Sequence, residues 1–346
     1  MHSKFDNSVS PHRSTWVAPD GTVETGNLRI PFSAYATDEA RQTFVAGLQP
    51  APPEIANDLP ALRKHYTAFN DKLCDQMLER FDVQVLETEI GGVPVHQVIP
   101  TAVRDDDGRT LLNLHGGAFM WGSGSGALVE AIPVAATSGI PVIAVDYRLA
   151  PEHTFPAASD DVQAVYEALL ASTPARAIGM FGCSAGAILT GQCMAQFLHH
   201  DLPLPGGIAM ISGAGLLPMG DSAYTSRALS GERSNTDIND TDVPMSVLWN
   251  YLQGTAVDDP RVAPGIDSRI LDRFPPSLLI AGSRDFAASS VTTMHRRLVA
   301  QQVDSELFLF DGMWHAFHIF PDLPESTEVY GLLARFFDRT LTPRTL

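Results

Sequence analysis

The chain is poor in cysteine and has no long hydrophobic run. Its 346 residues include three cysteines, Cys74, Cys183 and Cys193, with no CxxC spacing between them. This excludes a disulfide scaffold and a cysteine-based zinc site. No stretch of about 18 uncharged apolar residues occurs, so we expect no membrane-spanning helix.

Basic residues are scarce as well: 23 Lys and Arg stand against 40 Asp and Glu, a net charge of -17. A surface this acidic repels nucleic-acid phosphates and anionic lipid headgroups, so neither nucleic acid nor a membrane is expected as a stable partner. The opening stretch MHSKFDNSVSPHRSTW has no apolar signal-peptide core. These features predict a cytoplasmic protein.

What is present is the composition of a globular protein, with 45% hydrophobic residues. Residues 1–80 carry helical patterns at 37–48 and 62–81 without a core of their own, and we expect them to form a helical cap segment. From residue 81 two alternating runs flank Gly91-Gly92, which is typical of a β-hairpin.

Residues 81–346 are then expected to form the main α/β domain, because apolar runs alternate with helical stretches in the βαβ manner of a mostly parallel sheet flanked by helices. This rhythm lapses over 215–253, which indicates a cap insertion. The predicted strands are 110–116, 141–149, 177–182, 207–214, 276–285 and 305–313, and the predicted helices are 126–138, 156–171, 184–200, 287–302 and 325–339.

The stretch FGCSAGA, residues 181–187, places Ser184 between an apolar strand and a helix of small residues. Gly182 and Gly186 leave room for a sharp turn that exposes the serine hydroxyl, and the helix N-terminus favours a developing negative charge. GxSxG also arises by chance, so from this motif alone a structural turn serine is the alternative.

A nucleophilic serine needs a base and a carboxylate that orients the base. Asp285 follows one late strand in LLIAGSRDFA, and His315 follows the next in LFLFDGMWHAF, which matches the order serine, acid, histidine. His318 is a rival base, although its apolar surroundings favour a packed histidine. There is no HExxH motif, so we expect no metal and no cofactor.

The stretch LLNLHGGAFMWGS also follows a predicted strand. Gly116 and Gly117 let backbone N–H groups point at the nucleophile, and Ala185, after the serine, supplies another. These three are the predicted oxyanion-hole donors. His115 either tethers this loop or is a surface turn histidine.

Together these motifs resemble the hormone-sensitive-lipase-like (bacterial family IV) esterases of the α/β-hydrolase fold. The most specific match is DYRLAPEHTFPAASDDV, residues 146–162, and the resemblance runs from residue 81 to the C-terminus. It implies a serine carboxylesterase with a helical cap, a small-molecule ester as substrate and the triad Ser184, Asp285 and His315. It also implies a homodimer formed through the sheet edge and the last helix.

Three motifs depart from the family pattern. Ala118 replaces the third glycine of HGGG, which excludes positive φ there but keeps an N–H. The elbow GDSAGG becomes GCSAGA, and Cys183 is either a buried filler or a reactive thiol at a helix N-terminus. The usual DPL reads DFA over 285–287. These changes bear on pocket shape and activity level, not on the presence of the triad.

Three bulky residues, Phe119, Met120 and Trp121, follow the HGG turn. They are candidate substrate-binding residues that would shorten the acyl pocket; the alternative is that they pack beneath the loop as core. On the first reading we expect uncharged esters with short acyl chains, about C2 to C6.

Other functions fit parts of the sequence. GSGSGA, residues 122–127, with Asp146 imitates a dinucleotide fingerprint, but HGGAFMW separates its first glycine from the strand, where a pyrophosphate would have to meet the helix. A non-catalytic binding protein is a second alternative, since the gibberellin receptors resemble this family but lack the catalytic histidine; His315 argues against it. An amidase or lactonase of the same fold is a third.

Overall fold

A computed structural model describes residues 16–17, 23–24, 30–46, 52–55, 57–101, 108–229, 248 and 250–343. The chain divides into two units, residues 1–33 and 34–346. In the first unit β1 (Trp16–Val17) pairs antiparallel with β2 (Val23–Glu24). All elements described below belong to the second unit.

An eight-stranded sheet is the centre of the second unit, with the strand order β10-β9-β8-β7-β5-β6-β4-β3. The pairs β3–β4 and β4–β6 are antiparallel, and the remaining pairs are parallel. The predicted mostly parallel sheet is therefore confirmed. Its strands are β3 (Val83–Ile90), β4 (Val93–Pro100), β5 (Thr110–Leu114), β6 (Val142–Val145), β7 (Ile178–Cys183), β8 (Gly207–Ile211), β9 (Ser277–Gly282) and β10 (Ser305–Phe310).

The β3–β4 hairpin turns at Gly91 and Gly92, whose φ angles are +61° and +80°. A two-residue hairpin turn of this kind requires positive φ at both positions, which glycine adopts without strain. The Gly-Gly pair thus identified this hairpin correctly from the sequence.

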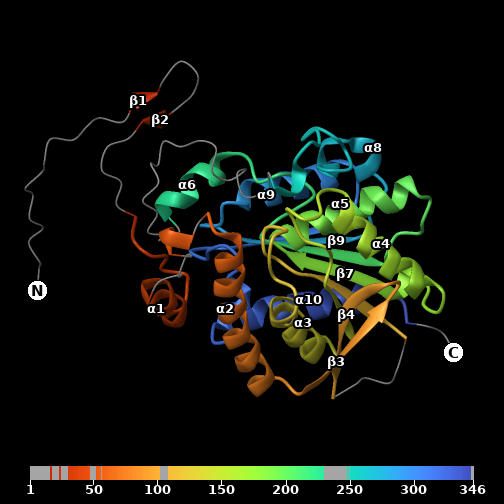
Figure 1. Ribbon diagram of the computed structural model, residues 1–346. Helices are drawn as coiled ribbons and strands as arrows, with labels where there is room; N and C mark the ends of the chain where they lie inside the picture. Colours follow the sequence, from red (N-terminus) through yellow and green to blue (C-terminus); the bar gives the residue numbers. More distant parts are fainter. Residues whose placement is uncertain are drawn as a thin grey trace, which may run out of the picture. The chain divides into compact units, whose positions relative to one another are not determined.

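Helices cover both faces of the sheet (Figure 1). On one side lie α3 (Ser125–Ser138) and α10 (Pro324–Thr340), which pack against each other. On the other side lie α4 (Ala157–Leu170), α5 (Ala185–His199) and α9 (Ala288–Ala300). The five predicted helices are all present, with ends shifted by no more than about two residues, the usual uncertainty of helix ends.

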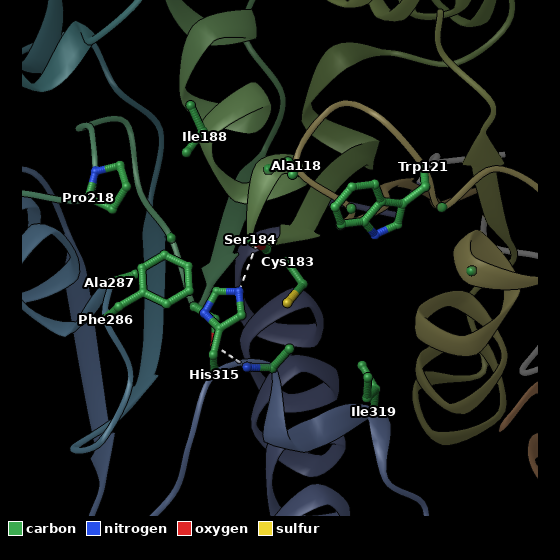
Figure 2. A pocket seen from close by; sticks show the side chains of 18 of the residues that line it. Ala118, Trp121, Cys183, Ser184, Ile188, Pro218, Phe286, Ala287, His315 and Ile319 are labelled. Carbon is green, nitrogen blue, oxygen red and sulfur yellow. Dashed lines mark hydrogen bonds between the residues drawn. The ribbon is translucent and has the colours of Figure 1, made fainter. Parts of the chain in front are cut away.

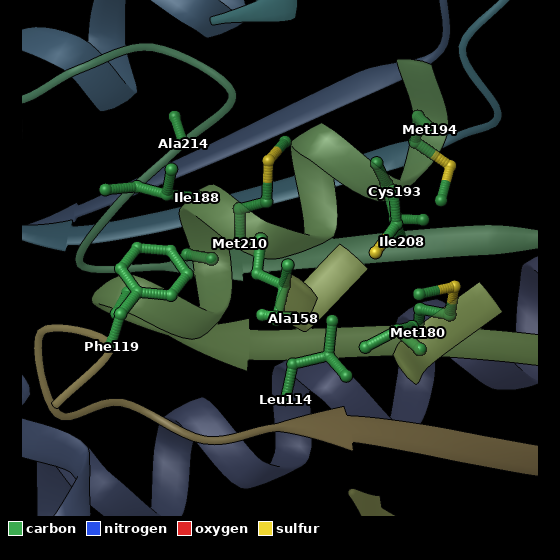
Figure 3. Packing of buried hydrophobic residues seen from close by; sticks show 14 of the residues in the cluster. Leu114, Phe119, Ala158, Met180, Ile188, Cys193, Met194, Ile208, Met210 and Ala214 are labelled. Atoms are coloured by element: carbon green, nitrogen blue, oxygen red, sulfur yellow. The ribbon is translucent and has the colours of Figure 1, made fainter. Parts of the chain in front are cut away.

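The core between the sheet and α5 contains aliphatic, sulfur-containing and aromatic side chains, among them Phe119 (Figure 3). Met180 on β7 and Met210 on β8 are fully buried, as are Cys193 and Met194 on the facing side of α5. All three cysteines are buried and unpaired, in accord with the absence of a disulfide framework. This packing gives the strand ends that carry the site a rigid support.

Four further segments lie outside the sheet and its flanking helices. They are α1 (Asp38–Ala46), η1 (Pro53–Ile55), α2 (Leu59–Arg80) and α6 (Asp221–Leu229). Asp58 caps α2 by accepting the Ala61 N–H. Of the expected 215–253 insertion, residues 230–247 and 249 lie outside the described residues.

The remaining short elements are η2 (Ala175–Ala177), η3 (Pro264–Ile266), α8 (Ser268–Leu271) and η4 (Phe317–Ile319). Within the described ranges, no helix is long and apolar enough to cross a membrane.

Candidate active site

Ser184 occupies a sharp turn between β7 and α5, with φ +56° and ψ -118°. Its N–H donates to the Ile211 carbonyl at 2.9 Å, which anchors the turn to β8. A Cβ at Gly182 would lie 2.5 Å from the Leu114 carbonyl oxygen, and one at Gly186 only 1.7 Å from it. Both glycines are therefore required for the close approach of β5 that exposes the serine hydroxyl.

The side chains of Ser184, His315 and Asp285 form one chain of hydrogen bonds. Figure 2 shows its first link, between Ser184 and His315. The serine hydroxyl lies 2.9 Å from His315 Nε2, and His315 Nδ1 lies 2.8 Å from Asp285 Oδ1. Because the carboxylate accepts the Nδ1 proton, Nε2 is left as the acceptor for the serine proton. The turns after β7, β9 and β10 bring together residues that lie far apart in the sequence.

Asp285 is fully buried, whereas 24% of the His315 side chain is exposed. Burial by itself would raise the pKa of the Asp285 carboxyl, but the neighbouring His315 and the hydrogen bond from the Ala287 N–H hold it below its ordinary value. The carboxylate therefore stays charged and keeps the imidazole in one tautomer.

The N–H groups that lack an acceptor near Ser184 are not the same three that were predicted as oxyanion donors. The Gly116 N–H donates to Glu130 Oε1 at 2.9 Å, so it is not available to an oxyanion. Within the described chain, the N–H groups of Gly117, Ala118 and Ala185 have no protein acceptor. Ala118 adopts φ +54°, contrary to the expectation that alanine would exclude positive φ at this position. Surrounding contacts must outweigh the strain of that conformation.

His115 tethers this loop. It is completely buried, and its Nδ1–H donates to the Gly116 carbonyl at 2.6 Å. Its ring stacks on Tyr147 at 4.2 Å, and the Tyr147 hydroxyl donates to the His115 carbonyl at 2.7 Å. Burial lowers the pKa of His115, so the ring stays neutral. Of the two readings left open by the sequence, the surface turn histidine is wrong.

Ser184 opens into a cavity of about 440 Å³. Of the three bulky residues after the HGG turn, only Trp121 lines it, stacked on Tyr66 of α2 at 4.4 Å. Phe119 is instead buried in the core and stacks on Tyr251 at 3.9 Å, and Met120 is also buried. The positive φ of Phe119 reverses the chain at this point, which separates its side chain from that of Trp121.

Several cavity residues were not identified from the sequence. Tyr66, Phe69 and Asn70 of α2 line the cavity. Their spacing of three and four residues places them on one helix face, and this signal was available in the sequence. Phe286, which replaces the usual proline of DPL, also lines the cavity.

Cys183 and His318, which the sequence offered as a reactive thiol and a rival base, are both buried. Burial raises the pKa of the Cys183 thiol well above its ordinary value, so it is not a reactive thiolate. His318 is almost completely buried, and burial lowers its pKa to about 3. Among the described residues, neither ring nitrogen of His318 has a hydrogen-bond partner. The rival base therefore makes no contact with Ser184.

Two residues of the dinucleotide-like pattern, Gly124 and Asp146, are joined by a hydrogen bond. Asp146 accepts the Gly124 N–H at 2.9 Å and lies 3.0 Å from His96 Nε2. In a dinucleotide site the corresponding carboxylate binds a ribose hydroxyl. Here it fixes the start of α3 beside the loop of residues 115–122, which carries predicted oxyanion donors and is called the oxyanion loop below. Nor do the described residues contain a group of three or more His, Cys, Asp or Glu that could hold a metal ion.

The sheet topology, the nucleophile turn and the hydrogen-bonded Ser-His-Asp set define an enzyme of the α/β-hydrolase class. Residues 111–319 match the protein family described as having the alpha/beta hydrolase fold, and the chain belongs to that family.

Individual relatives agree with this placement. An esterase from Acinetobacter venetianus is 28% identical over 269 residues, covering 77% of this chain and 86% of that protein. An acetyl-hydrolase from Streptomyces hygroscopicus is 29% identical over 238 residues, covering 68% and 77% respectively. A crystal structure of an esterase from the bacterial hormone-sensitive lipase family aligns with a TM-score of 0.75 at 25% identity, over 89% of this chain and 100% of that one.

The resemblance inferred from the sequence motifs is thus confirmed, and the protein is a carboxylesterase similar to the bacterial hormone-sensitive-lipase-type enzymes. This finding favours the enzyme over the receptor-like binding protein.

Proposed function

We propose that Ser184, His315 and Asp285 are the catalytic triad of this esterase and that its substrates are uncharged esters with short acyl chains. The observation that carries the proposal is the unbroken hydrogen-bond chain from Ser184 Oγ through His315 to the buried Asp285, with contacts of 2.9 and 2.8 Å. Such a chain activates a hydroxyl that is otherwise a weak nucleophile.

In the acylation step, His315 Nε2 takes the Ser184 proton while Oγ attacks the ester carbonyl. The N–H groups of Gly117, Ala118 and Ala185 stabilise the resulting oxyanion, because they are the donors without a protein acceptor. The C–O bond to the alcohol then breaks, His315 returns the proton to the leaving oxygen, and the acyl group stays on Ser184.

Deacylation repeats these steps with water. His315 Nε2 takes a proton from the water molecule, whose oxygen attacks the acyl carbonyl, and the same three N–H groups bind the second oxyanion. The bond to Oγ breaks, Ser184 recovers its proton from His315, and the carboxylic acid is released.

The cavity supports the proposed choice of substrate. It is lined mainly by apolar side chains, and no Lys or Arg occurs among the lining residues that the structure describes. An anionic ester would therefore find no countercharge there, and the net charge of -17 would repel it. The stacked Trp121 and Tyr66 rings restrict the space for an acyl chain. The Streptomyces hygroscopicus relative, named as an acetyl-hydrolase, is in line with this size limit.

The helices outside the sheet form a cap on this cavity. We assign residues 34–80, and from the 215–253 insertion residues 215–229 and 250–253, to the cap, and the rest of the described part of 81–346 to the catalytic domain. In support, α2 supplies Tyr66, Phe69 and Asn70 to the cavity. Arg63 of the same helix donates to the Met120 carbonyl at 2.8 Å, which ties α2 to the oxyanion loop.

A covalent-labelling experiment tests the triad directly. A fluorophosphonate should add one phosphonyl group to the purified protein at Ser184, detected by intact mass and peptide mapping. The Ser184→Ala variant should remain unlabelled, and labelling at another serine would contradict the proposal. A p-nitroanilide and a lactone offered beside the matching p-nitrophenyl ester decide between esterase, amidase and lactonase activity.

A further inference from the structure

A buried carboxyl group lies directly behind the oxyanion loop. Glu130, on α3, is only 5% exposed and is one of the residues that line the cavity. Its Oε1 accepts the Gly116 N–H at 2.9 Å, and its Oε2 accepts from Asn113 Nδ2 at 3.1 Å. The triad does not use this group, yet burying a carboxyl group without a cation is costly.

Glu130 is also close to the nucleophile. A Cβ built on Gly116 would lie 3.5 Å from Glu130 Oε1 and equally 3.5 Å from the Cβ of Ser184. The carboxyl group and the reacting serine therefore both lie next to a single glycine. A charge on Glu130 acts on the oxyanion more strongly than it would in water, because Glu130 is buried and the effective dielectric constant around it is lower.

The surroundings of Glu130 disfavour its charged form. Burial raises the pKa of Glu130 to about 7, although hydrogen bonds from Gly116, Asn113 and the Cys183 backbone act in the opposite direction. The titratable side chains that face it are the Cys183 thiol and the Tyr147 phenol, and burial raises the pKa of both, so both are neutral. Within the described chain no cation pairs with Glu130.

We propose that Glu130 is a positioning residue that holds the oxyanion loop through the Gly116 N–H, and that the enzyme is faster when this carboxyl group is protonated. The inference rests on the proposed oxyanion donors Gly117 and Ala118, which follow directly after the residue that Glu130 fixes. Fixing Gly116 keeps the next two N–H groups aimed at one point without reorganisation during the reaction.

A neutral carboxyl group can hold the loop as well as a charged one. Its carbonyl oxygen accepts the Gly116 N–H, and its hydroxyl can donate to Asn113 Oδ1 once that amide rotates. With the amide as it stands, Asn113 Oδ1 has no partner among the described residues. Ionisation keeps the Gly116 bond but adds a negative charge beside the developing oxyanion, which weakens the stabilisation of the transition state.

Two substitutions separate the hydrogen bond from the charge. Glu130→Gln keeps an acceptor for Gly116 and a donor for Asn113, but it has no charge at any pH. Glu130→Leu removes the acceptor and leaves a buried N–H unpaired. Glu325→Gln is the matched control, because Glu325 is also buried but lies on α10, where it accepts from Thr37.

The measurement is kcat and KM for p-nitrophenyl butyrate from about pH 5.5 to 9. The kcat of each variant is divided by that of the wild type at the same pH, so that pH effects of the catalytic base, which both proteins share, cancel. For Glu130→Gln, kcat relative to wild type should rise from near one at about pH 6 to roughly five- to tenfold at about pH 8.5. For Glu130→Leu, kcat should fall by about ten- to a hundredfold at every pH with little change in KM. Glu325→Gln should give a ratio that does not change with pH.

A flat ratio for Glu130→Gln, or an unchanged kcat for Glu130→Leu, overturns the inference. Should one variant fail to fold, the other still decides, since Glu130→Gln tests the charge and Glu130→Leu tests the hydrogen bond. Ser184→Ala distinguishes a failure of the Glu130 inference from a failure of the proposed function. If it abolishes hydrolysis while Glu130→Gln changes nothing, only the role of Glu130 is lost; if it leaves hydrolysis intact, the proposed function itself fails.

Discussion

The ring of Phe286 stacks on the imidazole of His315, with ring centroids 4.1 Å apart and planes inclined by 25° (Figure 2). Phe286 follows Asp285 in the chain, and its carbonyl accepts the Ser222 hydroxyl of α6 at 2.7 Å. One face of the proposed base is thus covered by an aromatic ring that α6 helps to hold. An aromatic face attracts the imidazolium that forms when His315 takes the serine proton.

Replacing Phe286 with Leu should lower kcat by about two- to fivefold, because a ring–cation attraction of about 0.5–1 kcal/mol is lost while the apolar cover remains. Steady-state kinetics with p-nitrophenyl butyrate measure this. Phe286→Tyr keeps the ring and should retain most of kcat. Equal losses in the two variants would show that size, rather than the ring, matters.

Ser184→Ala should leave a folded protein whose kcat is reduced at least about a thousandfold. Circular dichroism checks the fold, and p-nitrophenyl butyrate hydrolysis checks the activity. Because residue 184 has φ +56°, Ser184→Gly should exceed Ser184→Ala in free energy of unfolding by about 1 kcal/mol. Equal denaturation midpoints for the two variants would mean that the turn is not strained.

Trp121→Ala should move the acyl-chain optimum to longer esters, since it removes a ring that closes the cavity against Tyr66. The wild type should prefer about C2 to C6, and each methylene newly accommodated should add about 0.8 kcal/mol, or roughly fourfold in kcat/KM. A p-nitrophenyl ester series measures both profiles.

Met120→Leu is the control for that series, because Met120 is buried outside the cavity and its substitution should leave the profile unchanged. A wild-type optimum at about C10 or longer would refute the short-acyl proposal. A short optimum unaffected by Trp121→Ala would leave the short-acyl preference standing but show that Trp121 does not cause it.

Deleting residues 1–50 removes α1 and should reduce both kcat and the melting temperature. Thr37 donates twice to Glu325, at 2.8 and 2.9 Å, and Phe44 lies 5.9 Å from Trp314 and 5.0 Å from the Arg284 guanidinium. Trp314 and Arg284 precede His315 and Asp285 in the chain. Loss of their contacts with Phe44 should therefore loosen the proposed triad.

The shorter deletion of residues 1–29 keeps α1 and is the matched comparison for this prediction. It should retain most of the activity and stability of the full chain. If the two truncated proteins behave alike in hydrolysis and thermal unfolding, α1 makes no contribution to the site.

Some features could be predicted because they depend on neighbours in the sequence. Gly91-Gly92 specifies a hairpin through local φ angles, and the apolar periods specify five helices to within about two residues. The proximity of Ser184, Asp285 and His315 was also predictable. Parallel strands end at the same edge of a sheet, so residues just after late strands meet there.

Other features could not be predicted, because they depend on contacts between distant residues. Whether Gly116 is a free donor depends on Glu130, fourteen positions away on another element. Whether Phe119 faces the cavity depends on Tyr251, with which it stacks in the core. No local pattern encodes either contact.

The sequence by itself determined the fold class, the nucleophile turn and the three residues of the proposed triad, since short motifs and hydrophobic periods express local sterics and burial. Only the tertiary structure decided the strand order, the N–H groups that stay free for an oxyanion and the aromatic ring that reaches the cavity. Each of these is settled by competition for partners across the fold: Gly116 bonds to Glu130 and Trp121 stacks on Tyr66, and such long-range choices follow from the packing of the whole domain.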